Sequence, residues 1–453
     1  MYLLVLVALI LCILFKILNV NTSPQKSLFY SANAKFIEQI LQHAPTLCQP
    51  YVPTRLWGFS GHVQTIIQGV LSQIHCPFLN GKRYYFKHID GTTVTYDLYP
   101  AAGQHVLNRD YTLAICPGIG NSSDSVYIRR VVQEAQLGGY RVAVLNHIGV
   151  LKNVPVTSPR IFSYGNTNDY EGMVQDLIRR FPGTLMLSVG FSMGGNLITK
   201  YLGEEGRVKP KNIIGGISIC QGYDAARASK YMLDWEGFRR LYLFAMTENM
   251  KAILRRWQKQ LFTEQIKREK CINEKDVWYS ATLVDLDDSY TRKLYNFDSV
   301  EAFYRNSSSV HYFGGIKVPM IFLNAADDPI VPPPLTALAR KESEKNEKFI
   351  FIEQKHGGHL GFYEGGLIYP NNVTWLDRVL IEMANGMTQV HSSDKNSFVD
   401  EIDLIQSSSS SDTDEDTDLS SILANTSPKS IRFIPLKEKK AIKLRHNVNR
   451  NFF

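Results

Sequence analysis

A serine between glycines is the residue of this chain whose type and setting best suit covalent chemistry. The pentapeptide Gly190-Phe191-Ser192-Met193-Gly194 follows the apolar run 185–189 and leads into a run of helical character over 195–202. A G-x-S-x-G turn between a strand and a helix predicts a nucleophile elbow, in which the serine backbone is strained and the glycines remove side chains that would collide. The pentapeptide alone also fits an ordinary Gly/Ser turn. Other residues of the chain must therefore distinguish a nucleophile elbow from such a turn.

A carboxylate pair and a histidine loop supply such partners farther along the chain. Asp327 and Asp328 follow the apolar run 320–324, and His356 and His359 lie in a glycine-rich loop after the run 349–352. A serine hydroxyl needs a base to remove its proton, and the base needs a carboxylate to orient it. These groups follow a nucleophile elbow in the chain order Ser, Asp or Glu, His. The sequence therefore predicts a Ser-His-Asp triad, while the residues alone leave open which aspartate and which histidine belong to it.

The partner motifs also have structural interpretations. The two aspartates could form a turn or a helix cap, and the two histidines could belong to a metal site. No further carboxylate or cysteine with metal-ligand spacing lies beside the histidines, and the six scattered cysteines include no C-x-x-C pair. The sequence therefore predicts neither a metal nor a cofactor.

An oxyanion hole requires two backbone N–H donors that point at the reacting oxygen. One is expected from Met193, the residue after the nucleophile. The other is expected from the glycine-rich loop 117–121, where Ile119 is the first choice and Gly118 the second. The alternative is that this loop is a plain connection between a strand and a helix.

The elements around these motifs alternate between strands and helices. A hairpin is predicted over 84–98, helices over 125–138 and 168–181, and strands over 112–116, 141–146, 185–189, 213–220, 320–324 and 349–352. Short apolar strands separated by helices predict the α/β class, with a mostly parallel sheet covered by helices on both faces.

An insertion at about 223–312 interrupts this alternation. It is helical and aromatic, and its segment 239–275 is rich in lysine and arginine. An insertion at this point lies over the carboxyl ends of the strands, where ligands bind. It is either an ordinary helical subdomain with a charged outer face or a lid that contacts lipid, with its cations near phosphates.

Composition limits the class of protein. The chain has 453 residues, of which 44% are hydrophobic and 21% charged, as in globular proteins. The net charge of +7 is modest, and no interleaved basic and aromatic module predicts a nucleic-acid partner. We expect a lead-in segment over 21–75, a main domain over 76–385, and a disordered tail over 386–453 that is first serine-rich and acidic and then basic.

The first 20 residues are almost continuously apolar, interrupted by Lys16. This predicts an uncleaved signal anchor over 1–20, because a cleavable signal peptide would need a basic start and a small-x-small cleavage site. Lys16 and Lys26 follow the apolar run and would by themselves keep the body cytoplasmic. The expected arrangement is nevertheless a single-pass, type II protein of the endoplasmic reticulum or plasma membrane. Glycosylation sequons occur at Asn21, Asn121, Asn306, Asn372 and Asn425.

Several of these segments together resemble a known family, the membrane-anchored "AB hydrolase-4" group of α/β-hydrolase domain-containing lipases. The resembling pieces, within about 50–385, are 115–121, 144–149, 157–160, 189–196, 220–223, 324–329 and 356–362. The resemblance implies the α/β-hydrolase fold, with Ser192 as nucleophile, Asp328 rather than Asp327 as acid, and His359 rather than His356 as base. It also implies a single-pass anchor and acylglycerols or other carboxylic esters as substrates.

The group is also said to carry an H-x-x-x-x-D acyltransferase signature, which His105 and Asp110 fit here. They precede a strand in a predicted surface loop, so we interpret the match as a coincidence. The expected function is a membrane-anchored serine hydrolase of lipid esters, such as a monoacylglycerol lipase. The alternatives are a lipid acyltransferase and a non-catalytic membrane receptor or scaffold, and the sequence leaves the oligomeric state open.

Overall fold

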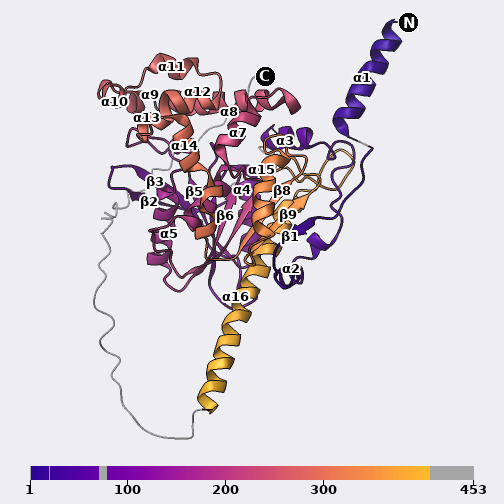
Figure 1. Ribbon diagram of the computed structural model, residues 1–453, viewed down its shortest axis with the longest axis vertical. Helices are drawn as coiled ribbons and strands as arrows, with labels where there is room; N and C mark the ends of the chain where they lie inside the picture. Colours follow the sequence, from indigo (N-terminus) through magenta and orange to yellow (C-terminus); the bar gives the residue numbers. More distant parts are fainter. Residues whose placement is uncertain (1, 20, 71–78, 409–453) are drawn as a thin grey trace.

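The computed structural model describes residues 2–19, 21–70 and 79–408 of the chain. Within them, one nine-stranded sheet in the order β1-β9-β8-β7-β6-β4-β5-β3-β2 forms the centre of the molecule (Figure 1). Its strands are β1 (Leu28–Tyr30), β2 (Lys82–Lys87), β3 (Thr93–Tyr99), β4 (Tyr111–Cys116), β5 (Arg141–Asn146), β6 (Leu185–Phe191), β7 (Ile213–Ile219), β8 (Met320–Ala325) and β9 (Phe349–Gln354).

The central strands β9, β8, β7, β6, β4 and β5 run parallel to one another. Antiparallel strands flank them on both sides, β1 beside β9 and β3 with β2 beside β5. The register pairs Cys116 of β4 with Gly190 of β6, so the loops that follow these two strands lie next to each other. The predicted α/β class with a mostly parallel sheet is confirmed. Strand β1 was not predicted, because three residues are too few to give a periodic pattern.

Helices cover both faces of the sheet, as predicted. Neighbouring residues on a strand point to opposite faces, so Leu113 and Ile115 belong to one hydrophobic core and Ala114 and Cys116 to the other. The helices of the first core are α2 (Ala34–Leu41), α4 (Val126–Leu137) and α16 (Trp375–Ser408). The second core includes α5 (Asn168–Arg180), α6 (Met193–Gly203) and α15 (Pro333–Ser343), and it continues into the helices between β7 and β8.

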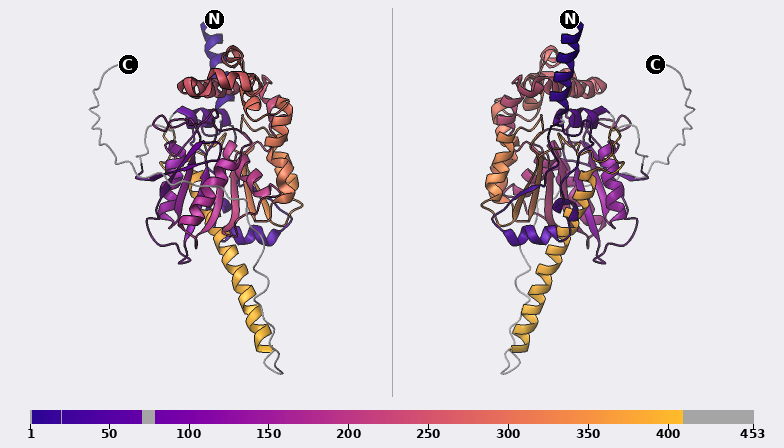
Figure 2. Two further views of the ribbon diagram at one scale, coloured as in Figure 1. Left: turned by 90° about the vertical axis from the view of Figure 1, so that its left-hand side faces the viewer. Right: turned by 90° about the vertical axis from the view of Figure 1, so that its right-hand side faces the viewer.

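A helical insertion between β7 and β8 lies above the carboxyl ends of the strands (Figures 1 and 2). We call it the lid. It consists of α7 (Ala225–Met232), η3 (Glu236–Phe238), α8 (Arg239–Arg256), α9 (Gln258–Leu261), α10 (Glu264–Glu269), α11 (Glu274–Tyr279), α12 (Leu283–Leu286), η4 (Asp287–Thr291), α13 (Arg292–Leu294), α14 (Val300–Ser307) and η5 (Ser309–Gly315). A further helix at this end of the sheet, α3 (Gly61–Val70), comes from the lead-in segment.

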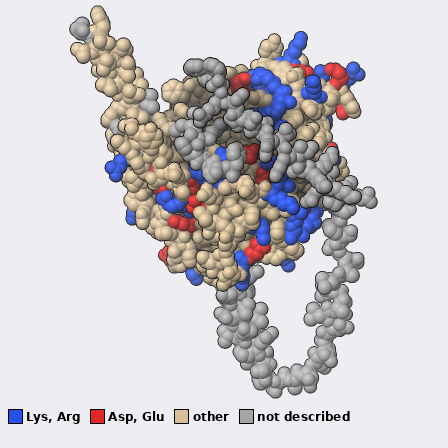
Figure 3. Space-filling view, turned by 180° about the vertical axis from the view of Figure 1, so that it is seen from behind, with Lys and Arg blue, Asp and Glu red and all other residues tan. Residues whose placement is uncertain are grey.

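The apolar start of the chain forms helix α1 (Tyr2–Leu18). It projects from the body as an almost uncharged column (Figure 3), and every side chain from Tyr2 to Lys16 is exposed. In the described part of the chain, no helix has both the length and the apolar character needed to cross a membrane. The prediction of a membrane-spanning anchor over 1–20 is therefore not supported.

The other end of the chain also differs from expectation. A disordered tail was predicted from residue 386, but α16 continues to Ser408. Met387 is still buried in a hydrophobic core, and Val390 packs against that core. The helix passes the predicted boundary because 387–408 contain no proline or glycine to end it. The acidic and basic parts of the predicted tail, from residue 409 on, lie outside the described residues.

Candidate active site

Ser192 lies at a sharp turn between β6 and α6, with φ 53° and ψ −117°. A positive φ at a non-glycine residue costs on the order of 1–3 kcal/mol and persists only where the surroundings enforce it. A Cβ on Gly190 would collide with the carbonyl oxygen of Gly194, and a Cβ on Gly194 would collide with that of Cys116. The glycines of the pentapeptide therefore allow the backbone to pack closely enough to hold Ser192 in this conformation.

A chain of two hydrogen bonds joins the predicted serine, histidine and aspartate. The Oγ of Ser192 lies 2.8 Å from Nε2 of His359, and Nδ1 of His359 lies 2.7 Å from Oδ2 of Asp328. Because Nδ1 donates its hydrogen to the carboxylate, Nε2 carries a free lone pair that accepts from the serine hydroxyl. The structure thus brings together three side chains that are separated by up to 167 residues.

Asp328 and His359 are both held from behind. The amides of Ile330 and Val331 donate to the other carboxylate oxygen of Asp328, Oδ1, at 2.8 and 3.0 Å, and the Asp328 side chain is fully buried. The backbone N–H of His359 donates to the hydroxyl of Thr65 on α3 at 2.9 Å. These bonds fix the positions of the carboxylate and of the histidine loop without using the atoms that face Ser192.

The second Asp–His pair lies beside the first but faces away from the serine. Asp327 accepts the amide hydrogen of Gly358 at 2.8 Å, and its other oxygen lies 3.5 Å from Nδ1 of His356. His356 is buried, its ring packs edge-on against Phe59, and its Nε2 faces Thr22. Burial raises the pKa of Asp327. This pair braces the histidine loop.

The two predicted oxyanion donors border the same cavity as Ser192. The amide of Gly118 donates to the hydroxyl of Tyr127 at 2.9 Å, so this second-choice donor is already engaged. The ring of His147 donates to the carbonyl oxygen of Pro117 at 3.0 Å. Tyr127 and His147 therefore bind the N–H and the carbonyl oxygen of the same peptide group, between Pro117 and Gly118, and hold the loop just before Ile119.

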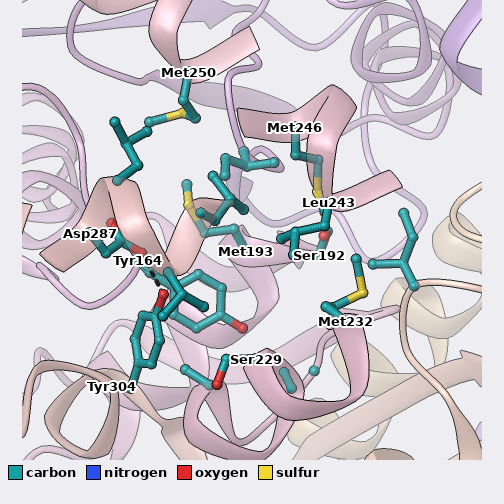
Figure 4. A pocket seen from close by; sticks show the side chains of 18 of the residues that line it. Tyr164, Ser192, Met193, Ser229, Met232, Leu243, Met246, Met250, Asp287 and Tyr304 are labelled. Carbon is teal, nitrogen blue, oxygen red and sulfur yellow. Dashed lines mark hydrogen bonds between the residues drawn. The ribbon is translucent and has the colours of Figure 1, made fainter. Parts of the chain in front are cut away.

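A cavity of about 150 Å³ opens beside Ser192 (Figure 4). Its floor comes from the sheet side, with Ile119, Met193 and Val331, and its roof from lid residues such as Leu243 and Met250. Ligand pockets are usually about 300–1,000 Å³ in volume. The cavity is therefore small for a ligand pocket, and its lining is mostly apolar. A long substrate would need the lid to move.

The lid is tied to α3 next to the active site. Tyr242 on α8 lies with its hydroxyl 2.9 Å from Nδ1 of His62, and the two rings stack. Phe238 also packs edge-on against the ring of His62. Burial lowers the pKa of His62, and Arg239 lowers it further. The lowered pKa favours the neutral imidazole, whose Nδ1 can accept a hydrogen bond from the hydroxyl of Tyr242.

Several basic residues of the lid are engaged within the protein. Lys251 donates to the carbonyl oxygens of Trp278 and Ser280, Arg256 donates to Val150, and Lys267 pairs with two glutamates. These contacts agree with a structural role for the three cations. These three residues therefore do not support the interpretation that the basic segment binds lipid phosphates.

The H-x-x-x-x-D signature lies at the other end of β4 from the site. His105 packs against the rings of Tyr111 and Tyr140, and Asp110 pairs with Arg141. β4 runs from Tyr111 toward the loop at Ile119, so the motif begins where the strand is farthest from Ser192. It takes no part in the site.

Sequence reasoning missed three residues that support this site: Thr65, Tyr127 and His147. Each acts through one hydrogen bond to the backbone of a loop far away in the sequence, and single polar residues of this kind give no motif. For Thr65 the only signal in the sequence is the aromatic character of the preceding segment around Trp57, which favours packing against the main domain. Among the described residues, no group of three histidine, cysteine or acidic side chains could hold a metal ion.

Comparison with known proteins identifies relatives over most of the chain. The family described as alpha/beta hydrolase fold matches residues 111–366. An abhydrolase domain-containing protein 2 of Drosophila melanogaster is 49% identical over 388 residues, which are 86% of this chain and 97% of that protein. The human protein named monoacylglycerol lipase ABHD2 is 38% identical over 84% of this chain and 91% of its own length.

A solved structure of the esterase Pf2001 from Pyrococcus furiosus is similar with a TM-score of 0.40 and 14% sequence identity, and covers 62% of this chain and 83% of its own.

Proposed function

Because this chain belongs to the α/β-hydrolase family, we propose that it cleaves carboxylic esters of lipids, with acylglycerols, above all monoacylglycerols, as substrates. The observation that carries the proposal is the hydrogen-bonded order Ser192, His359, Asp328 beside an apolar cavity. The relatives named monoacylglycerol lipase support the choice of acylglycerols. No cofactor takes part in the proposed reaction.

The reaction begins with attack of Ser192 Oγ on the ester carbonyl carbon. His359 Nε2 takes the hydroxyl proton, and the carboxylate of Asp328 stabilises the imidazolium that forms. The amides of Met193 and Ile119 donate to the oxyanion. The first lies at the amino end of α6, where the helix dipole also favours negative charge.

Collapse of the tetrahedral intermediate expels the alcohol, which takes the proton from His359, and leaves an acyl group on Ser192. Water then gives a proton to His359 and attacks the acyl carbonyl, and the fatty acid leaves as the proton returns to Ser192. The same two amides stabilise the second oxyanion, so one site serves both halves of the cycle.

We also propose that the protein meets its substrate at a lipid surface. Exposed apolar side chains cover α1 and also the lid segment 235–244. In that segment Trp235, Phe238, Leu241 and Phe244 are each more than half exposed. Burying these four side chains in lipid would contribute on the order of 6 kcal/mol. Surface patches of this kind mark interaction sites.

The experiment is labelling with a fluorophosphonate probe and turnover of mono-, di- and triacylglycerols and short esters. Ser192→Ala should lose labelling, and its kcat should fall by about 10⁶-fold. The matched control is Ser188→Ala, since Ser188 lies on the same strand but outside the cavity lining. It should label and turn over like the unchanged protein.

Three outcomes would contradict the proposal. Labelling that persists in Ser192→Ala would place the nucleophile elsewhere. Transfer of the acyl group to added glycerol in place of its release as fatty acid would indicate an acyltransferase. Binding of esters without any turnover would indicate a receptor or scaffold.

A further inference from the structure

The cavity beside Ser192 has one polar end. Most of its lining is aliphatic, thioether or aromatic, but Asp287, Thr291 and Tyr304 line it together. In Figure 4, Asp287 and Tyr304 lie across the cavity from Ser192, with Met193 between them. Within the described part of the chain, Asp287 is the only carboxylate of this lining. A charged group thus sits where a plain hydrocarbon chain would end.

The carboxylate of Asp287 has partners but keeps acceptor capacity. The hydroxyl of Tyr304 donates to Oδ2 of Asp287 at 2.8 Å, and the hydroxyl of Thr291 forms a second hydrogen bond. An ionised carboxylate can accept about four hydrogen bonds. Burial raises the pKa of Asp287 to about 6, because these two bonds do not replace the lost hydration. A further donor in the cavity would therefore stabilise the ionised carboxylate.

The backbone that carries this carboxylate is unusual. Asp287–Thr291 forms the π-helical turn η4 between α12 and α13. π-Helical turns are rare and occur frequently at functional sites. Asp287 and Thr291, at its two ends, both line the cavity, whereas the neighbouring carboxylates of Asp285 and Asp288 are exposed. The irregular turn therefore coincides with the place where polar groups meet the cavity.

The position of these groups selects one kind of ligand. An unsubstituted chain that reached Asp287 would remove water from the carboxylate without replacing a hydrogen bond. The free hydroxyls of a glycerol ester lie close to the ester itself and would stay near Ser192. A hydroxyl on the chain, remote from the ester, can donate to Asp287 while the rest of the chain lies against the apolar lining.

We propose that Asp287, Thr291 and Tyr304 form a binding subsite for a hydroxyl carried by the hydrocarbon chain that enters the cavity, so that the preferred substrates are esters of hydroxylated lipids. This inference rests on the proposed function, because it takes Ser192 as the point of reaction. The chain can be the acyl group or a long-chain alcohol, since both bring the same donor to the same place.

Two series of esters test this subsite. The first varies the hydroxyl position along a medium-length acyl chain of 4-methylumbelliferyl esters, and the second varies it along the alcohol of one plain acyl ester. In at least one series, one position should raise kcat/KM at least about tenfold over the unsubstituted ester, the effect of a hydrogen bond to a charged group. The series in which this occurs identifies which chain enters the cavity.

Variants at the subsite should remove this preference without removing catalysis. Asp287→Leu should bring the ratio of hydroxylated to unsubstituted kcat/KM close to one, and Tyr304→Phe should lower it. Asp287→Asn keeps the shape of the side chain and replaces Asp287→Leu in this test if that variant fails to fold. Asp287→Asn should also lower the ratio. The matched control is Asp288→Asn, which removes an exposed carboxylate of the same turn and should leave the ratio unchanged.

Binding separates this inference from the proposed function. In Ser192→Ala protein, the favoured hydroxylated ester should bind at least about tenfold more tightly than its unsubstituted counterpart, and adding Asp287→Leu should abolish the difference. Equal binding and equal kcat/KM at every hydroxyl position, or a preference that survives loss of Asp287, would overturn the inference. Absence of Ser192-dependent turnover would overturn the proposed function instead, and the binding series would still decide on the subsite.

Discussion

At the scale of single residues, the site depends on which of two adjacent carboxylates faces which histidine. Asp328 contacts the ring that reaches Ser192, while Asp327 holds the backbone of the histidine loop through Gly358. The two aspartates differ by one position in the chain and serve different tasks, because neighbouring side chains at the end of a strand point in different directions.

Replacing each aspartate by asparagine separates these tasks. Asp328→Asn should lower kcat by about 10³- to 10⁴-fold, because an amide at this position does not favour the tautomer or the charge that His359 needs. Asp327→Asn keeps an oxygen for the amide of Gly358 and should cost far less. Steady-state hydrolysis of a soluble short-chain ester measures both effects, with thermal unfolding as the check on folding. A larger loss for Asp327→Asn than for Asp328→Asn would contradict the assignment.

At the scale of elements, the site is assembled by segments that reach the carboxyl ends of the strands from elsewhere. α3 supports the histidine loop through Thr65 and holds the lid through His62. The same short helix thus contacts both the histidine loop and the cover of the cavity.

The contact between His62 and Tyr242 should make stability depend on pH. The folded pKa of His62 lies below its usual value, although Asp327 and Asp328 oppose burial and the charge of Arg239. Stability from neutral His62 is therefore present above about pH 6.5 and is lost as the pH falls through the folded pKa. We therefore compare the melting temperatures of the unchanged protein and of His62→Asn. The advantage of the unchanged protein over the variant should become smaller as the pH is lowered from about 8 to about 5.

The asparagine keeps an acceptor near the position of Nδ1 but does not titrate, and other titrating groups cancel in the difference. Tyr242→Phe serves as the second variant, since it removes the hydrogen bond and keeps the ring. It should lower the melting temperature at pH 8 more than at pH 5. A difference between the unchanged protein and His62→Asn that stays constant with pH would contradict a contribution of neutral His62 to stability.

At the scale of the whole molecule, the apolar surfaces lie at one end. α1 and the lid are both at the end of the body that carries the site, and the extended part of α16 is at the other (Figure 2). α1 connects to the body through Asn19, whose side chain donates to the carbonyl oxygen of Phe59 at 3.1 Å. An exposed helix joined in this way contributes little to the stability of the fold.

Removal of residues 2–18 tests this separation. The shortened protein should keep its melting temperature and its kcat/KM on a water-soluble short ester, because the side chains from Tyr2 to Lys16 are exposed. Its binding to phosphatidylcholine vesicles should weaken, since much of the apolar surface is gone. Vesicle flotation measures the binding, and removal of residues 409–453 is the control that leaves α1 in place. Unchanged flotation after loss of α1 would contradict its proposed role at a lipid surface.

The sequence by itself was sufficient for the parts of the protein that local pattern encodes. Strand and helix alternation predicted the sheet, because apolar periodicity reflects which face of each element is buried. The elbow motif predicted Ser192, because only glycines fit at Gly190 and Gly194 when the backbone turns so sharply. The order of the motifs predicted that an aspartate and a histidine would follow.

Only the tertiary structure decided what depends on contacts between distant segments. It brought Asp328 and His359, rather than Asp327 and His356, into one hydrogen-bonded chain with Ser192, a choice that the family resemblance implied but that the local pattern of adjacent residues left open. It revealed Thr65, Tyr127 and His147 as supports, and it joined Asp287 to Tyr304 at the far end of the cavity. These contacts connect residues whose separation along the chain leaves no periodic trace, and they form only when the sheet brings the loops together.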